Sequence, residues 1–221
     1  MNDKKQIIDT STWIRKVPFE WFNSFINPTY SFNVKIDVSN IVSYSKETNT
    51  SFFANFLYVV TRSINDVEAL RLRLEDENVV LYDRIDPDFT VKTEDGTFNN
   101  AGFTYTKDYK EFYKRCRETI NNNNKTANTL KDYNSSSKYN LFYSSCLTSI
   151  DIESMTHPIK AEDKESTAVP RIFWSKYILD NDKYYLMLNI TVSHALVDGE
   201  DLALVFKKIK EYSLNFKEII K

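Results

Sequence analysis

The stretch from Asn189 to Asp201 carries the residues best suited to chemistry. His194 ends a run of β-forming residues, and an Asp-Gly pair, Asp198-Gly199, follows four residues later. The whole chain holds only two histidines and three glycines, and this stretch uses one of each. A histidine at the end of a strand can act as a general base, because an ordinary imidazole is largely neutral near pH 7. Asp198 could orient this base or brace the turn; the alternative is a histidine satisfied in the core or at a sheet edge.

Two elements must position these residues. Residues 172–179 and 184–192 alternate as strands and flank Asp180-Asn181-Asp182, which is typical turn chemistry, so they predict a hairpin whose returning strand leads to His194. From Asp201 onward, apolar residues recur at helical spacing: Leu202, Val205, Phe206 and Ile209. His194 is therefore expected between the last strand and a closing helix.

The rest of the chain mixes helical and strand patterns. A first helix is expected from Pro18, with Phe19, Phe22 and Phe25 on one face, and Ser39 is expected to cap a short helix. The other segments follow in chain order: a half-buried strand over 31–38, an apolar helix over 50–65, a hairpin over 71–82, an amphipathic helix over 107–120, a polar loop over 121–137 and a β-region over 139–152.

Composition narrows the class of protein. The chain has 221 residues, 42% of them hydrophobic, which suffices for one substantial core, so 1–221 is interpreted as a single domain. A net charge of -2 gives no general cationic field and argues against nucleic acid as the main partner. No apolar run reaches the ~20 residues of a membrane span, and the first residues lead into no signal-peptide core, so an intracellular, cytoplasmic protein is expected. Cys116 and Cys146 stand apart without metal spacing; free thiols and no metal site are expected.

Three motifs together resemble the chloramphenicol acetyltransferase family. The pattern His-x-x-x-Asp-Gly at His194 is similar to its active-site signature, which dihydrolipoamide acyltransferase domains share. The opening Trp13-Ile14-Arg15-Lys16 with Phe19-Glu20 is similar to its Trp-x-Arg-Lys-x-x-Phe-Glu, and Asp83 through Pro87 to Thr90-Val91 is similar to its Asp-x-x-x-Pro-x-x-Thr-Val. The resemblance spans most of the chain from Trp13, although residues 120–170 align loosely.

The resemblance implies a fold and a reaction. The fold would be α/β, a two-layer sandwich of a mixed β-sheet covered by helices, assembled as a homotrimer with each active site at a subunit interface. The reaction would transfer acetyl from acetyl-CoA to a hydroxyl, with His194 as general base. It also implies that Arg15 pairs with Asp198 and that Ser145 stabilises the oxyanion. Ser144 is adjacent, however, and strand alternation turns only one of the two serines inward.

By the same resemblance, further residues would contact the substrates. The acceptor pocket would be lined by Trp21, Phe22, Ile26, Tyr30 and Phe98, and Lys176 and Tyr177 would border the coenzyme A channel. Core packing and ordinary surface exposure are the alternatives for these side chains. His157, before a proline in a loop, is interpreted as a structural or surface residue.

The chain departs from the family at several of these positions. Arg171 and Phe173 stand where an aliphatic residue and a threonine are usual, and they share one face of a strand. The charge of Arg171 must then find a carboxylate, a carbonyl or solvent. Ser51 and Phe53 replace a lysine and a tyrosine near the coenzyme A channel. Three functions stay open: acetylation of chloramphenicol or a related molecule, acyl transfer to a different hydroxyl or thiol, and a catalytically silent trimer that only binds.

Overall fold

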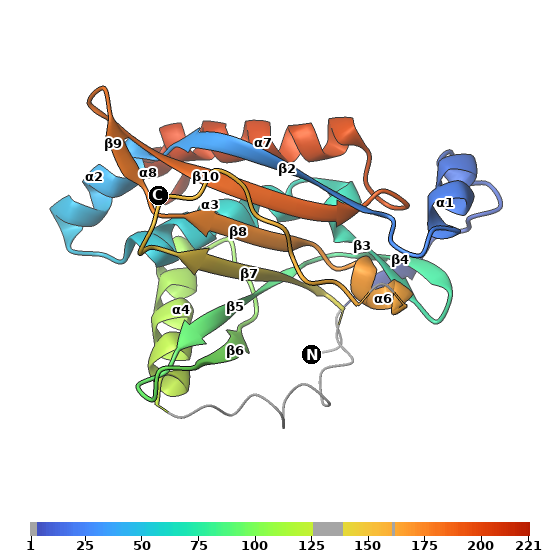
Figure 1. Ribbon diagram of the computed structural model, residues 1–221, viewed down its shortest axis with the longest axis horizontal. Coiled ribbons are helices and arrows are strands. Elements are labelled where there is room, and N and C mark those ends of the chain that lie inside the picture. Colours follow the sequence, from blue (N-terminus) through green and yellow to red (C-terminus); the bar gives the residue numbers. More distant parts are fainter. Residues whose placement is uncertain (1–3, 126–138, 161) are drawn as a thin grey trace.

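A large mixed β-sheet and a layer of helices form the protein (Figure 1). The computed structural model describes residues 4–125, 139–160 and 162–221. Helices α3 (Phe52–Asn65) and α7 (Gly199–Leu214) lie behind the sheet in Figure 1, and among the described residues no long helix lies on the opposite face. The expected two-layer α/β arrangement is therefore present.

The large sheet places strands from distant parts of the chain side by side. Its order is β2-β10-β8-β7-β5-β6, with β9 also paired to β10. Strand β7 runs parallel to β5 and β8, and all the other pairs are antiparallel. The bounds are β2 Thr29–Asp37, β5 Asp86–Lys92, β6 Phe98–Gly102, β7 Leu141–Leu147, β8 Arg171–Ser175, β9 Ile178–Asp180 and β10 Lys183–Ser193.

A second sheet of three strands, β1 (Lys5–Ile7), β4 (Asn78–Tyr82) and β3 (Leu72–Glu75), lies at one end of the large sheet. The β3–β4 turn is made by Asp76 and Glu77, both with positive φ, as a tight two-residue hairpin requires. The fully buried Arg73 joins this sheet to β7, because its guanidinium donates to the carbonyls of Tyr139 and Leu141.

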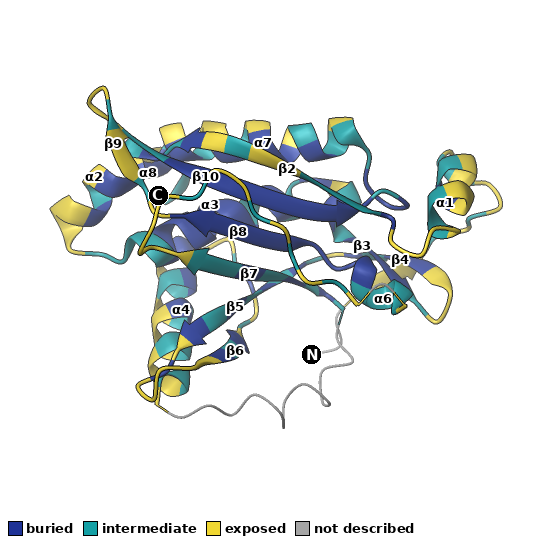
Figure 2. Cartoon of the chain, in the orientation of Figure 1, coloured by how far each residue is buried: buried dark blue, intermediate teal, exposed yellow. Residues whose placement is uncertain are grey.

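The remaining helices surround α3 and α7 or extend from the sheet. They are α1 Lys16–Asn23, α2 Ser39–Thr48, α4 Tyr109–Asn123, α6 Lys164–Thr167 and α8 Phe216–Ile219, with a 3₁₀ turn at Glu68–Arg71. One hydrophobic core lies between the helices and the sheet, and Figure 2 shows α3, β8 and β10 as mostly buried. Trp174 on β8 packs there against Phe53 and Phe56 of α3.

Most predicted elements are present, with three differences. Ser39 is the first residue of α2 and does not cap it, because its hydroxyl donates to Asp37 and accepts from the Tyr184 amide. The β-region over 139–152 ends at Leu147, and an irregular segment then crosses the helix-free face of the sheet to reach α6 (Figure 1). Helix α4 continues to Asn123, and most of the predicted polar loop lies outside the described residues.

Candidate active site

His194 lies immediately after β10, the longest strand. Strand β10 pairs with β2 as far as Ser193 opposite Thr29, and the His194 amide then donates to the Pro28 carbonyl at 2.9 Å. Helix α7 begins at Gly199 with Asp198 as its N-cap. Because the backbone is fixed on both sides, the position of the His194 side chain is set by the sheet and by the start of α7.

Two aromatic rings hold the His194 imidazole. Phe22 of α1 stacks on it with ring centroids 3.9 Å apart and planes 7° from parallel, and the Tyr30 ring lies 4.6 Å away. The Tyr30 hydroxyl donates to the Val197 carbonyl at 3.3 Å. Burial and the charge of Asp198 raise the pKa of Tyr30, so this donor stays protonated at neutral pH. The rings of Phe22 and Tyr30 therefore form an aromatic wall that holds the imidazole in one plane.

Asp198 links His194 to Arg15. The two carboxylate oxygens of Asp198 divide their contacts: one pairs with Nη1 of Arg15, and the other lies 3.6 Å from Nδ1 of His194. Nη2 of Arg15 also donates to the His194 carbonyl at 3.4 Å. Nδ1 of His194 is buried without a hydrogen-bond partner among the described residues, which leaves Nε2 as the nitrogen able to meet a substrate. The expected pair of Arg15 and Asp198 is present, and it ties the two ends of the chain together.

The aromatic residues of α1 continue this wall outward. Trp21 packs against Phe22 with ring centroids 4.8 Å apart and is 62% exposed, and Ile26 is 76% exposed. Trp21 thus extends the aromatic wall of Phe22 and Tyr30 toward solvent, and Ile26 lies in the segment just after α1.

Ser145 lies on a different part of the sheet. It stands on β7 opposite Phe173, and its hydroxyl accepts from Thr90 of β5 at 3.3 Å. Ser144 points to the opposite face, where its hydroxyl donates to the Asp88 carbonyl at 3.1 Å and the side chain is buried. Of the two serines, Ser145 is therefore the one on the helix-free face.

Arg171 and Phe173, expected to depart from the family pattern, share the face of Ser145. Both are buried. The Arg171 guanidinium donates to the carbonyls of Ser166 and Val169 and to the Ser166 hydroxyl, so its charge is accommodated by carbonyls. These hydrogen bonds connect Arg171 to α6 and to the segment just after it.

The residues expected to border coenzyme A lie at the Ser145 end of the sheet. Lys176 is exposed just after β8, and Tyr177 packs against Phe52 at the start of α3 with ring centroids 4.7 Å apart. Phe98, 55% exposed, opens β6 opposite Lys92, the last residue of β5. Because β5, β7 and β8 run in the same direction, their carboxyl ends all lie at this end.

Within one chain, the expected site residues therefore form two groups that lie apart from each other. The histidine group contains His194, Asp198, Arg15, Trp21, Phe22, Ile26 and Tyr30; the serine group contains Ser145, Phe98, Phe173, Lys176 and Tyr177. Ser145 pairs with Phe173 on β8, and Phe173 pairs with Asn189 on β10, so Ser145 is level with Asn189. Asn189 lies five residues before His194. At about 3.4 Å per residue this is roughly 17 Å along the strand, and Ser145 is also two strands away. Figure 1 shows β7 and β10 ending at opposite ends of the sheet.

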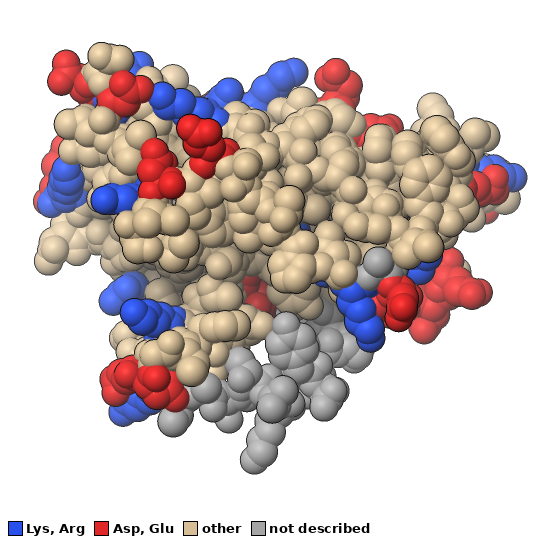
Figure 3. All heavy atoms as spheres, viewed as in Figure 1, with Lys and Arg blue, Asp and Glu red and all other residues tan. Residues whose placement is uncertain are grey.

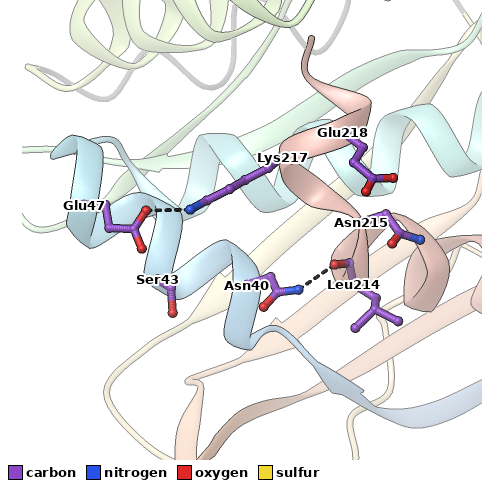
Figure 4. A pocket seen from close by; sticks show the side chains of 7 residues that line it. All are labelled: Asn40, Ser43, Glu47, Leu214, Asn215, Lys217 and Glu218. Carbon is purple, nitrogen blue, oxygen red and sulfur yellow. Dashed lines mark hydrogen bonds and ion pairs between the residues drawn. The ribbon is translucent and has the colours of Figure 1, made fainter.

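Two surface pockets lie outside these groups. One, of about 270 Å³, lies among α2, α7 and α8 (Figure 4); Lys217 pairs there with Glu47, and Asn40 donates to the Leu214 carbonyl. The other, of about 380 Å³, is lined by residues that include Arg71, Arg84 and Lys107. Figure 4 shows these two contacts between the side chains that line the first pocket.

His157 has the structural surroundings expected of it. Its Nε2 is hydrogen-bonded to the Asn189 amide oxygen at 3.1 Å, and burial lowers the pKa of His157 to about 4. Within the described residues there is no group of three or more His, Cys, Asp or Glu side chains arranged to hold a metal. No helix in that part of the chain is long and apolar enough to cross a bilayer.

Two side chains of the site were missed by sequence reasoning. Thr90, which bonds to Ser145, belongs to the Thr-Val motif noted above, and that motif was the available signal. Asp201 accepts a hydrogen bond from the Asp198 amide and lies 3.9 Å from Arg15. An acidic residue three positions after a helix N-cap is the usual signal for such a contact.

Comparisons with known proteins identify relatives of this chain. The family model of chloramphenicol acetyltransferase matches residues 3–210. The chloramphenicol acetyltransferase of Proteus mirabilis is 26% identical over 207 residues, 93% of each chain, and chloramphenicol acetyltransferase 3 of Escherichia coli is 23% identical, covering 92% of this chain and 94% of its own.

Solved structures extend the likeness to the fold. A chloramphenicol acetyltransferase structure superposes with a TM-score of 0.87 at 28% identity, covering 95% of this chain and 99% of its own. A dihydrolipoamide acetyltransferase of Azotobacter vinelandii shares the fold, with a TM-score of 0.63 at 13% identity. The chain belongs to the chloramphenicol acetyltransferase family.

Proposed function

We propose that the protein is an acetyl-CoA-dependent O-acetyltransferase that acetylates chloramphenicol or a related small molecule. The observation that carries this proposal is the His194 imidazole, stacked on Phe22 and placed beside the ion pair of Asp198 and Arg15, in a member of this family. A base held in one orientation is what proton transfer from a hydroxyl requires.

The proposed reaction uses Nε2 of His194, the ring nitrogen able to meet a substrate, as the base. Nε2 of His194 takes the proton as the acceptor oxygen attacks the thioester carbonyl, and the new C–O bond leaves a tetrahedral oxyanion. When this intermediate collapses, the C–S bond breaks and the proton passes from His194 to the leaving thiolate. Each stage therefore balances with acetyl ester and coenzyme A as products. The base contributes roughly 10² to 10⁴-fold to the rate, and an oxyanion donor roughly 10² to 10³-fold.

The oxyanion donor in this proposal is Ser145 of a neighbouring subunit in a homotrimer. The separation of the histidine and serine groups supports it, because a head-to-tail contact places the serine end of one copy against the histidine end of the next. Figure 3, which views the helix-free side, shows a broad uncharged area over its middle and right, with charged side chains mostly at the rim. Such a surface suits subunit contact.

Acetyl-CoA is the proposed donor, and the residues at the serine end fit it. Lys176 supplies an exposed cation suited to phosphate, and Tyr177 is fixed beside the start of α3 by Phe52. A donor of this kind implies a cytoplasmic enzyme. Neither nucleic acid nor a membrane enters the proposed reaction.

A different small acceptor is the second candidate. Phe173 is a large buried side chain on the face of Ser145, where the family usually has a threonine, so it reduces the space beside the reacting centre. The acceptor is then a hydroxyl compound that is smaller than chloramphenicol on this side.

Release of thiol from acetyl-CoA tests the proposal across a panel of hydroxyl and thiol acceptors. His194→Ala should lower acceptor-dependent release by at least roughly 10²-fold while the fold and oligomeric state stay unchanged. His157→Gln is the matched control, since the second histidine lies outside both groups, and it should keep the wild-type rate. Wild-type protein with no release for any acceptor would favour a silent binding trimer. Release that persists in His194→Ala would exclude the histidine as the base.

A further inference from the structure

Helix α1 carries the Phe22 ring that packs beside His194, but the helix itself has little intrinsic stability. It has eight residues, of which only Phe19 is buried, and isolated helices this short are marginal in water. Figure 1 shows it at the edge of the molecule, apart from the main helical layer. Because Phe22 of this helix stacks on His194, any movement of α1 also changes the surroundings of the imidazole.

The two ends of α1 are held by two different cations. Arg15, the N-cap residue, pairs with Asp198. At the other end, Nζ of Lys164 donates to the Asn23 carbonyl at 2.8 Å and to the Phe25 carbonyl. These carbonyls belong to the C-terminal end of the helix and the segment just after it, and the last turn of α1 has no basic residue of its own. A cation there satisfies orphan carbonyls and complements the helix dipole.

Lys164 can act as a fixed point because the short helix α6 is itself anchored. Arg171 of β8 donates to both the carbonyl and the hydroxyl of Ser166 at 3.0 Å. Glu165 accepts the Asp76 amide of the β3–β4 turn at 2.8 Å, and Asp163 caps the first turn by accepting the Ser166 amide. Helix α6 is thus tied to both sheets before Lys164 reaches α1.

We propose that Lys164 is a positioning residue for the acceptor side of the active site. It holds the far end of α1 against α6, and α1 in turn holds Phe22 on His194. Arg171, the departure from the family on β8, acts in the same chain of contacts through Ser166. This inference rests on the proposed acetyltransferase function, but the position of α1 can be measured without any reaction.

Lys164→Met tests the proposal, because methionine keeps most of the side-chain length and removes the donor. The first readout is hydrogen–deuterium exchange of the α1 amides, where loss of a charge-assisted hydrogen bond should accelerate exchange by roughly tenfold. The second is steady-state kinetics. The acceptor KM should rise severalfold while the acetyl-CoA KM stays unchanged, since Lys176 and Tyr177 lie at the other end of the sheet.

Two variants act as controls. Lys164→Arg keeps a cationic donor and should restore most of the wild-type exchange rate and acceptor KM. Lys160→Met removes an exposed lysine on the preceding segment whose side chain forms no hydrogen bond or ion pair with a described residue, and it should leave both readouts unchanged. A purely structural loss would raise both KM values, lower the melting temperature and resist rescue by arginine.

The outcomes separate this inference from the proposed function. Unchanged α1 exchange in Lys164→Met overturns the inference, whatever the activity. Faster exchange with an unchanged acceptor KM in an active enzyme also overturns it, because α1 would then move without affecting the site. A wild-type protein that transfers no acetyl group refutes the function, and the exchange experiment still decides whether Lys164 holds α1.

Discussion

Mixing two inactive variants should restore activity if the active site is shared between subunits. His194→Ala removes the base and Ser145→Ala removes the oxyanion donor, so each homotrimer should be slower by at least roughly 10²-fold. In a mixed trimer, some interfaces combine the intact histidine of one copy with the intact serine of another. Activity should therefore return only when the two variants exchange subunits.

The size of the effect follows from the geometry. Ser145 and His194 of one chain are separated by roughly 17 Å along β10 and by two strand spacings of about 4.8 Å across the sheet. A base and an oxyanion donor that serve the same carbonyl must lie within hydrogen-bond reach, about 3 Å, of the attacking oxygen and of the oxyanion, which are both bonded to that carbon. After random mixing in equal amounts, the chain that supplies the histidine has an intact histidine with a chance of one half. The chain that supplies the serine has an intact serine with the same chance, so about one quarter of wild-type activity should return.

The assay is thiol release after the two variants are unfolded together in denaturant and refolded. Variants refolded separately and then combined are the control, and they should stay inactive as long as subunits do not exchange. Ser144→Ala replaces Ser145→Ala in a further control, and its homotrimer should stay active because Ser144 faces away from the helix-free side. If co-refolding restores no activity while wild-type protein survives the same treatment, the shared site is refuted.

Two further predictions concern charged and titrating groups. Arg15→Ala and Asp198→Ala should each lower kcat/KM and the free energy of unfolding. The double variant should lose less than the sum of the two single losses, with a coupling energy of about 1 kcal/mol or more in urea unfolding and in kinetics. Additive losses would show that the pair does not act as a unit. The pKa of His157, lowered by burial to about 4, lies below the ordinary value near 6.5, so the folded state binds fewer protons and stability should fall as the pH drops from about 6.5 toward 4. Melting temperatures of His157→Gln should vary less over this window, and an identical slope would contradict the assignment.

Periodicity in the sequence was sufficient for the main elements. The apolar pattern over 50–65 corresponds to α3, and the run leading to His194 corresponds to β10. The family and the mixed α/β fold are confirmed by the comparisons. The error at Ser39 has a physical reason: a serine can cap a helix or bond to a neighbouring strand, and here the Tyr184 amide and the Asp37 carboxylate both use its hydroxyl.

The site was less accessible to pattern reasoning because its contacts join distant segments. Arg15 and Asp198 are 183 residues apart, and only the resemblance connected them. Lys164 carried no signal, since a lysine in a polar segment before a strand looks like any surface charge. Arg171 was noticed as a departure, but its bonds to Ser166 depend on the path of the chain into α6, which periodicity does not define.

The outer face of α1 has a consequence for the proposed assembly. Val17 and Trp21 of α1 and Ile26 just after it are 74%, 62% and 76% exposed, while Phe22 on the same helix packs against His194. Exposed apolar residues gathered in this way usually mark a contact surface. In a head-to-tail trimer, the histidine end of one copy faces the serine end of the next, so this surface lies where the neighbouring subunit and the acceptor both approach. The same short helix would then orient the base on its inner side and complete the acceptor pocket on its outer side, and this dual use explains why both of its ends need to be held.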